Sequence, residues 1–356
     1  MLDIINQRII FADILKIIAI FAVINIHVSG SFSIASFTTT NITNWWLDNV
    51  FNGASRWAVP IFFMVSGMLL LEPKKNDSLK VFFTKRFNKI FIPFIVWGVL
   101  YELIKPRYTG VDFTFKEMIK DFLGGSIYTH FWFMYAIIVI YIFAPILKSF
   151  VAKASKETLL YTLAVWFVFV SILPQLEHLL KFNFDYSTDI SFICSYAGYF
   201  LLGHVLSQYE FTKLFKSVVY TGAIIGLIFA PISTYYLTKK NDGNYATFFS
   251  NNLSPDVILI AVSVFLLFKS INWDRVSGKK QEVFVRGIET LSKTSFGIYL
   301  LHFIVLNELV RSGIGVFKVD APSILRVPIT DIAVFSISFA VIYLLQKIPL
   351  VKKIVP

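Results

Sequence analysis

Charged residues are scarce in this chain of 356 residues, since Asp, Glu, Lys and Arg together make up only 15% of it. A soluble domain of this length carries about 25%. Hydrophobic residues make up 56%, Phe alone occurs 38 times, and the mean hydropathy is +0.69. The shortage of charge argues against an ordinary soluble domain and indicates a chain that contacts lipid over much of its surface.

Cysteine is almost absent, because Cys194 is the only one. A single thiol excludes an intramolecular disulfide and argues against a metal site built on thiolates. A convincing cleavable signal is missing as well. The first apolar run contains Asp13 and Lys16 and lacks a small-residue cleavage site, so we expect it to stay in the mature protein.

The net charge of +11 raises the question of a nucleic-acid partner. The basic residues lie between the apolar runs, however, where Lys and Arg set the orientation of membrane proteins. We therefore expect a lipid bilayer and no nucleic acid as the environment of the chain.

Apolar runs of about 20 residues predict transmembrane helices. Ten of them are found, at 9–30, 51–71, 87–104, 130–149, 157–175, 189–208, 214–237, 253–272, 285–306 and 327–346. No internal repeat and no soluble appendage are visible. The predicted fold class is all-α, a polytopic membrane bundle in which residues 1–356 form one membrane domain.

Lys and Arg predict the orientation of the bundle. With the N-terminus inside, about 21 basic residues fall in cytoplasmic segments and about 10 in external ones. The loop at 31–50 has none, whereas the segments at 72–86 and 269–293 are rich in them. Both termini are therefore predicted to be cytoplasmic.

The longest polar connection, 105–129, falls on the outer side. Its apolar residues have helical spacing and predict a short amphipathic helix on the membrane surface. They are Phe113, Phe115, Met118, Ile119 and Phe122. An ordinary loop is the alternative interpretation.

Three ionisable residues lie in the first predicted helix, Asp13, Lys16 and His27. Such residues are costly in lipid and usually face a bundle interior or a wet cavity. Lys16 and His27 share a helix face about 16 Å apart, whereas Asp13 lies about 21 Å from His27. We expect Asp13 to pair with Lys16, and a partner of His27 to come from another helix.

The topology sorts the polar residues of the other helices by depth. The predicted outer layer holds His27, Arg56, His130 and His302, and the predicted inner layer holds Lys16, Arg86 and Lys89. Each has a simpler interpretation: Arg56 can reach the lipid head groups, and His130 or His302 can be a satisfied interface histidine. The three histidines of the outer layer raise the question of a zinc site. Nearby carboxylates and thiols are too few to complete one, so no metal is expected.

Several stretches in this order resemble the acyltransferase-3 family of membrane proteins. They are Asp13-Ile-Leu-Lys16 followed by His27, Ser55–Gly67, Lys85-Arg86 before Pro93-Phe94, His130–Tyr135 and Ser295–His302. In that family Arg or Lys precedes a histidine by eleven positions, as Lys16 precedes His27. Within the family the likeness is greatest to enzymes that O-acetylate enterobacterial common antigen.

The resemblance implies transfer of an acyl group, most often acetyl from cytoplasmic acetyl-CoA, to a hydroxyl of a cell-surface glycan or its lipid-linked precursor in a bacterial cytoplasmic membrane. Catalytic roles are thereby expected for His27, Arg56, His130 and His302, and donor binding for Lys16, Arg86 and Asp13. Two features depart from the family: Lys16 replaces the commoner Arg, and no extracellular hydrolase-like domain follows the last helix.

Histidine is also the usual side chain to take a proton from a hydroxyl at neutral pH, and an imidazole can instead carry the acyl group covalently. The sequence leaves both routes open for His27. It also leaves open a transporter or flippase for a lipid-linked glycan, and a non-catalytic sensor or accessory domain.

Overall fold

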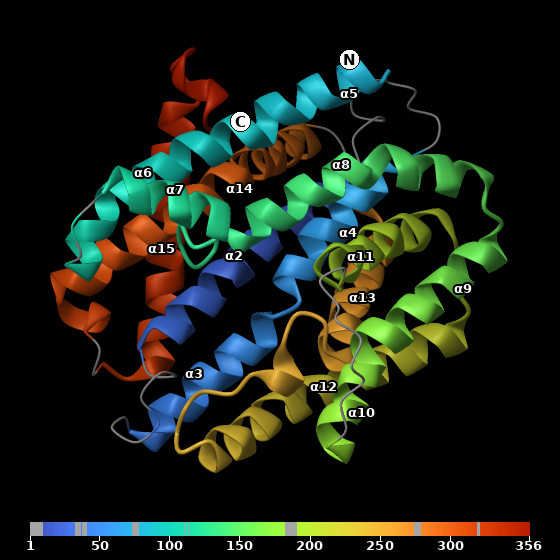
Figure 1. The fold of residues 1–356 in the computed structure, drawn as a ribbon, viewed down its shortest axis with the longest axis horizontal. Coiled ribbons are helices and arrows are strands. Elements are labelled where there is room, and N and C mark those ends of the chain that lie inside the picture. Colours follow the sequence, from blue (N-terminus) through green and yellow to red (C-terminus); the bar gives the residue numbers. More distant parts are fainter. Residues whose placement is uncertain are drawn as a thin grey trace.

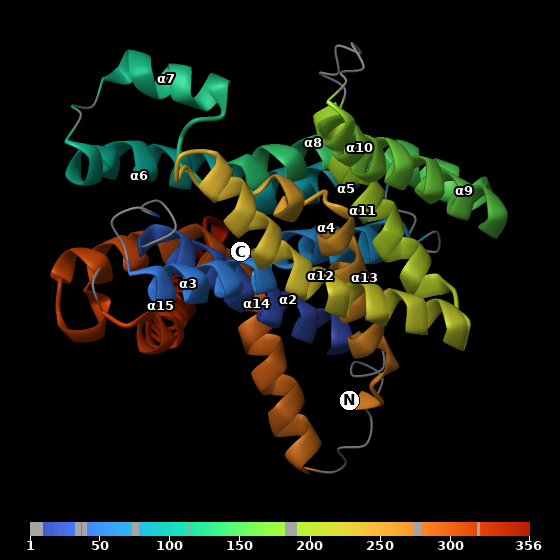
Figure 2. The same cartoon turned by 90° about the horizontal axis from the view of Figure 1, so that it is seen from below.

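The computed structural model describes residues 10–32, 37, 41–72, 78–110, 112, 114–181, 191–273, 279–318 and 321–356. Within these ranges the chain is helical and contains no β-strand (Figures 1 and 2). Eight of its helical runs are long and apolar enough to cross a membrane. The predicted all-α, polytopic membrane bundle is confirmed.

Every one of the ten predicted spans coincides with a helix or a helical run. The α-helices are α2 (Ile10–Phe32), α3 (Ile42–Ser55), α4 (Ala58–Leu70), α5 (Leu79–Arg86), α6 (Ile92–Thr109), α7 (Phe115–Gly124), α8 (Trp132–Lys153), α9 (Lys156–Phe167), α10 (Leu173–Leu180), α11 (Ser191–Gln208), α12 (Lys213–Lys240), α13 (Pro255–Ser270), α14 (Lys279–Ser312) and α15 (Ser323–Leu345).

The second span begins earlier than predicted and is broken in the middle. Helix α3 already starts at Ile42, inside the predicted loop 31–50, and a turn at Arg56 and Trp57 separates it from α4. Pro60 accounts for the break, because a proline has no N–H for the carbonyl of residue i−4 and its ring clashes with that carbonyl. Residue i−4 of Pro60 is Arg56, so the carbonyl of Arg56 does not receive the usual helical hydrogen bond.

Two further spans contain a π-helical turn close to a proline. The segment η2 (Phe87–Phe91) joins α5 to α6 just before Pro93, and η3 (Val168–Ile172) joins α9 to α10 just before Pro174. Each wide turn lets the helical run continue past its proline. The fifth span therefore extends to Leu180, five residues beyond the end predicted for it at residue 175.

Helix α14 is longer than its predicted span of 285–306. Its 34 residues correspond to about 51 Å, well beyond the roughly 30 Å of the hydrocarbon core. Figure 2 shows its N-terminal turns projecting past the other helices.

The connection between α6 and α8 contains the helix that its apolar spacing predicts. Helix α7 is capped by Thr114, whose hydroxyl accepts a hydrogen bond from the backbone N–H of Glu117, and lies beside α6, outside the bundle (Figure 2). One apolar edge, Phe115, Ile119 and Leu123, is exposed. Phe113, part of the predicted pattern, lies outside the described residues.

Helix α2 lies at the centre of the bundle and packs against α3, α4, α13, α14 and α15 (Figure 1). Its side chains Leu15, Ala19, Ile20 and Ile24 have no solvent exposure. The run from Ile10 to Phe32 is continuous, so the helical spacing between Lys16 and His27 holds.

Helices α4 and α11 cross in close contact through two glycines. A Cβ at Gly67 would lie 1.7 Å from the carbonyl oxygen of Phe200, and one at Gly203 would lie 1.9 Å from that of Met64. Small residues let membrane helices approach in this way. The crossing fixes the position of α4, which begins directly after Arg56.

Buried polar contacts hold α15 against α2 and α3. Arg326 donates from Nη2 to Asp48 Oδ2 at 2.7 Å, and both side chains are fully buried. Asp331 accepts from the Asn25 amide at 2.6 Å, and the Asn25 oxygen accepts from the Ser55 hydroxyl at 3.0 Å. These contacts fix the end of α3 next to Arg56.

Candidate active site

A cavity with a volume of about 1330 Å³ extends along α2. Asp13 and Lys16 line one end of it and His27 the other. Because the predicted orientation puts the end with Lys16 on the cytoplasmic side, we call it the inner cavity.

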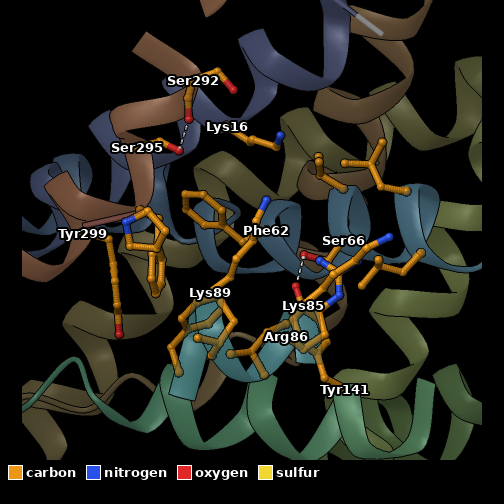
Figure 3. Close-up of a pocket in the computed structure, with 18 of the residues that line it drawn as sticks. Lys16, Phe62, Ser66, Lys85, Arg86, Lys89, Tyr141, Ser292, Ser295 and Tyr299 are labelled. Carbon is orange, nitrogen blue, oxygen red and sulfur yellow. Dashed lines mark hydrogen bonds between the residues drawn. The ribbon is translucent and has the colours of Figure 1, made fainter. Parts of the chain in front are cut away.

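The charged side chains that line the inner cavity are almost all basic. They are Lys16, Lys85, Arg86, Lys89, Lys148, Lys293, Lys347 and Lys352, whereas Asp13 is the one carboxylate side chain in the lining. They come from α2, α5, η2, α8, α14 and the segment after α15. Figure 3 shows four of them, Lys16, Lys85, Arg86 and Lys89, around one space. A concentration of positive charge of this kind attracts anionic groups such as phosphates.

Asp13 contacts Ser292 and Lys16, and it does not reach His27. Its Oδ1 accepts a hydrogen bond from Ser292 at 2.6 Å and lies 3.3 Å from the ammonium nitrogen of Lys16. The predicted pairing of Asp13 with Lys16 is therefore present. Ser292 belongs to α14, so the pair also joins α2 to that helix.

Arg86 and Lys89 lie on the two sides of the junction between α5 and η2. The guanidinium of Arg86 is over the rings of Phe82 and Tyr141, at 5.4 and 5.6 Å from their centroids, and its Nε has no hydrogen-bond partner among the described residues. Tyr141 donates to the Ser66 hydroxyl at 3.5 Å (Figure 3). Aromatic faces thus hold a cation that forms no ion pair with a carboxylate of the described residues.

A second cavity, of about 480 Å³, lies on the other side of His27, and we call it the outer cavity. Arg56 and Asn52 line it together with Tyr245 and Asn252, which belong to the connection between α12 and α13. The connection between α12 and α13 therefore reaches the site. No acidic side chain is part of this lining.

The two cavities share one wall. His27, Val23, Val59 and Trp132 line both of them. Of these four, His27 is the one with a titratable and nucleophilic side chain. An imidazole in this wall can meet one molecule from each side.

The three histidines of the predicted outer layer are in contact. The ring centroid of His302 lies 5.3 Å from that of His27 and 5.2 Å from that of His130. Phe303 packs against His27 at 4.4 Å and against His130 at 4.9 Å. The polar neighbour from another helix that His27 was expected to need is thus His302 of α14.

The hydrogen bonds of His302 define its tautomer. Its Nδ1 lies 2.6 Å from the carbonyl oxygen of Tyr299, and a carbonyl only accepts, so Nδ1 carries the proton. In the neutral ring Nε2 is then an acceptor, and it is buried without a partner in the described part of the chain. Both ring nitrogens of His130 are likewise buried and unpartnered there, while its carbonyl accepts from the Tyr299 hydroxyl at 2.6 Å.

Arg56 has neutral neighbours. Its Nε donates to the side-chain oxygen of Asn52 at 2.8 Å, and the same oxygen lies 3.5 Å from the Tyr245 hydroxyl. The Asn52 amide donates to the carbonyl of Ile26, the residue before His27, at 2.8 Å. Asn52 therefore connects Arg56 to the backbone beside the histidine.

Sequence reasoning did not single out Asn52, Ser292, Lys148 or Lys352. Asp48, Asn49 and Asn52 have the three- and four-residue spacing of one helix face, a signal that could have identified the first of these. Ser292 and the two lysines carry no comparable signal. Within the described residues, no group of three or more His, Cys, Asp and Glu side chains is arranged to hold a metal ion.

A family model described as "Acyltransferase domain" matches residues 9–346, nearly the whole chain. This match decides the family. The chain belongs to the acyltransferase-3 family. Membership of this family implies a membrane acyltransferase.

The curated relatives are more distant. The chain is 24% identical over 267 residues to the "Probable poly-beta-1,6-N-acetyl-D-glucosamine export protein" of Staphylococcus aureus strain Mu50, and equally to that of strain MRSA252. Each match covers 71% of this chain and 70% of the relative. No solved structure is significantly similar.

Proposed function

We propose that this acyltransferase moves an acetyl group from cytoplasmic acetyl-CoA to a hydroxyl of a cell-surface glycan, or of its lipid-linked precursor, in the bacterial cytoplasmic membrane. The observation that carries the proposal is the position of His27 in the wall between a cationic cavity and a cavity without acidic side chains. A donor in one cavity and an acceptor in the other would meet at its imidazole.

The inner cavity suits coenzyme A. The phosphates of the donor would bind the lysines and Arg86, since charge-assisted hydrogen bonds to phosphate oxygens are among the strongest available. The acyl-bearing arm would then extend along α2 from Lys16 towards His27, over about 16 Å. Asp13 would act through Lys16, by holding its ammonium group in place.

His27 can serve the transfer in two ways. As a general base it takes the proton of the acceptor hydroxyl while the new C–O bond forms and the C–S bond breaks, and the proton ends on the thiolate of coenzyme A. As a nucleophile it first accepts the acetyl group and releases coenzyme A, and then passes the group to the hydroxyl. Both routes need His27 accessible from both cavities.

The neighbouring groups support either route. The unpartnered Nε2 of His302 can accept a hydrogen bond from an N–H of the His27 ring and so orient that ring. His130 lines the inner cavity near His27, and Arg56 lines the outer one, where cationic and N–H groups can stabilise the negative charge that develops on the carbonyl oxygen.

The glycan is the least defined partner. Enterobacterial common antigen is suggested by the sequence resemblance, whereas the curated relatives are named for poly-β-1,6-N-acetylglucosamine. Both are bacterial surface polysaccharides, and we propose this class as the acceptor.

The test follows labelled acetyl from acetyl-CoA into a glycan in membranes that contain the protein. We expect His27→Ala to abolish both glycan labelling and release of coenzyme A. A matched control is His178→Gln, because His178 lies on α10, stacks on Phe248 and lines neither cavity. Acetyl transfer that is unchanged in His27→Ala would refute the proposal.

A second candidate function is glycan export without acyl transfer, which is the function that the Staphylococcus aureus relatives are named for. An exporter would move glycan across sealed vesicles without consuming acetyl-CoA. The labelling experiment, carried out in sealed vesicles, separates acyl transfer from export, because export predicts glycan that crosses the membrane without acquiring the acetyl label.

A further inference from the structure

The outer cavity contains an arginine, Arg56, whose charge is not balanced by any carboxylate in the described part of the chain. Arg56 forms no ion pair with any carboxylate of the described residues, and no Asp or Glu lines the cavity. Its neighbours Asn52 and Tyr245 are neutral. A charge at membrane depth is costly, and such charges usually pair with an opposite charge.

The position of Arg56 is fixed by the backbone and by its contacts. The break before Pro60 takes it out of the helix, and the hydrogen bond to Asn52 holds Nε while leaving the rest of the guanidinium towards the cavity. Asn52 is itself anchored to the carbonyl of Ile26 and to the Ser29 hydroxyl, at 2.8 and 3.3 Å. The guanidinium is thus preorganised beside His27.

The rest of the lining fits a sugar. Trp132, Tyr245 and Phe303 offer flat apolar faces, and Asn252 and Ser31 offer hydrogen bonds to hydroxyls. A volume of about 480 Å³ is in the range of small-ligand sites.

We infer that the outer cavity binds an acceptor glycan carrying an oxyanion close to the hydroxyl that is acylated, and that Arg56 binds this oxyanion. The inference rests on the proposed function and specifies its acceptor. Guanidinium groups bind carboxylate and phosphate with matching geometry, so the oxyanion can be a carboxylate of the glycan or a phosphate of its lipid carrier. A glycan with free amino groups would be repelled by the same charge.

Binding to a protein that cannot turn over tests the inference. His27→Ala protein in detergent would be given four probes in two matched pairs. The first pair is a glucuronate-containing oligosaccharide and its carboxyl-reduced form. The second is N-acetylglucosamine linked to polyprenol through a diphosphate and the same sugar linked to polyprenol directly by a glycosidic bond. We expect the anionic member of one pair to bind roughly 10- to 100-fold more tightly, and that pair identifies the source of the oxyanion.

Adding Arg56→Gln should remove this preference and leave the affinity for the neutral member nearly unchanged. The control is Arg107→Gln, because Arg107 already pairs with Glu308 at 2.8 Å and lines neither cavity. Arg107→Gln should keep the preference.

Equal binding of neutral and anionic members in both pairs would overturn the inference. So would an Arg56→Gln variant that retains the preference, or one that weakens all four probes equally. None of these results would refute the proposed function, because that function is tested separately by acetyl transfer from acetyl-CoA in protein with His27 intact.

Discussion

The crossing of α4 and α11 makes Gly203→Ala a demanding test of the structure. A Cβ at this position would lie 1.9 Å from the carbonyl oxygen of Met64, whereas carbon and oxygen atoms in close contact are at least about 3.3 Å apart. The two helices would have to separate by about 1.4 Å, since the obstacle is backbone and cannot rotate away.

The separation should affect stability and activity together. Overpacking of this kind costs about 1–3 kcal/mol. Helix α4 carries Val59, which lines both cavities, and Phe62 and Ser66 of the inner one. A displacement of about 1 Å at a reacting geometry can lower the rate by about 100-fold.

Unfolding of the detergent-solubilised protein and acetyl transfer would be measured on the same samples. Gly287→Ala is the control, because Gly287 lies in α14, is exposed and has open space where a Cβ would go. That variant should be neutral or more stable by about 0.5–1 kcal/mol. A Gly203→Ala protein with the stability and rate of the wild type would refute the packing of α4 on α11.

Three further predictions follow from other contacts. Asp48→Ala leaves the fully buried Arg326 without the carboxylate of Asp48 and should destabilise the protein by about 3–5 kcal/mol, whereas Asp48→Leu combined with Arg326→Met should recover most of the loss. Equal stability of the single and the double variant in denaturant titrations would contradict this. Lys16→Ala should weaken acetyl-CoA binding roughly tenfold, and binding to the wild-type protein should weaken as the salt concentration is raised. If a binding titration gives the variant the affinity of the wild type, donor phosphates do not bind in the inner cavity. Ile42→Cys in a Cys194→Ser background should react with an impermeant thiol reagent added outside intact cells, because residue 42 is 48% exposed at the start of α3, which is predicted to lie on the outer side. Labelling that occurs only after lysis would reverse the predicted orientation.

The positions of the helices could be predicted from the sequence because hydropathy directly reports burial in lipid. All ten runs from 9–30 to 327–346 coincide with helices. The grouping of His27, His130 and His302 could also be predicted, because alternate helices run in opposite directions and place their ends at known depths. The continuous α2 kept the spacing of Lys16 and His27 intact.

The errors concern helix ends and breaks. The start of α3 at Ile42 was missed because Asn44, Asp48, Asn49 and Asn52 make this stretch polar, yet their partners are inside the bundle. Hydropathy cannot distinguish a polar residue in a loop from one paired with another helix. The π turn after Arg86 depends on how a helix accommodates Pro93, which no apolar pattern encodes.

The shared wall of the two cavities is a property of packing alone. Val23, Val59 and Trp132 are ordinary apolar positions in the sequence, and only the crossing of α2, α4 and α8 puts them around His27. The role of Asn52 as a connection between Arg56 and the Ile26 carbonyl likewise depends on the break before Pro60 and on contacts between helices, which hydropathy does not report.

Transfer across the membrane is the central claim, and sealed inside-out vesicles test it most directly. Labelled acetyl-CoA would be added outside, on the cytoplasmic face, with a glycan acceptor trapped in the lumen. We predict labelled glycan in the lumen with wild-type protein and none with His27→Ala. Labelling only of glycan supplied on the same side as acetyl-CoA would contradict a reaction at the wall between the two cavities.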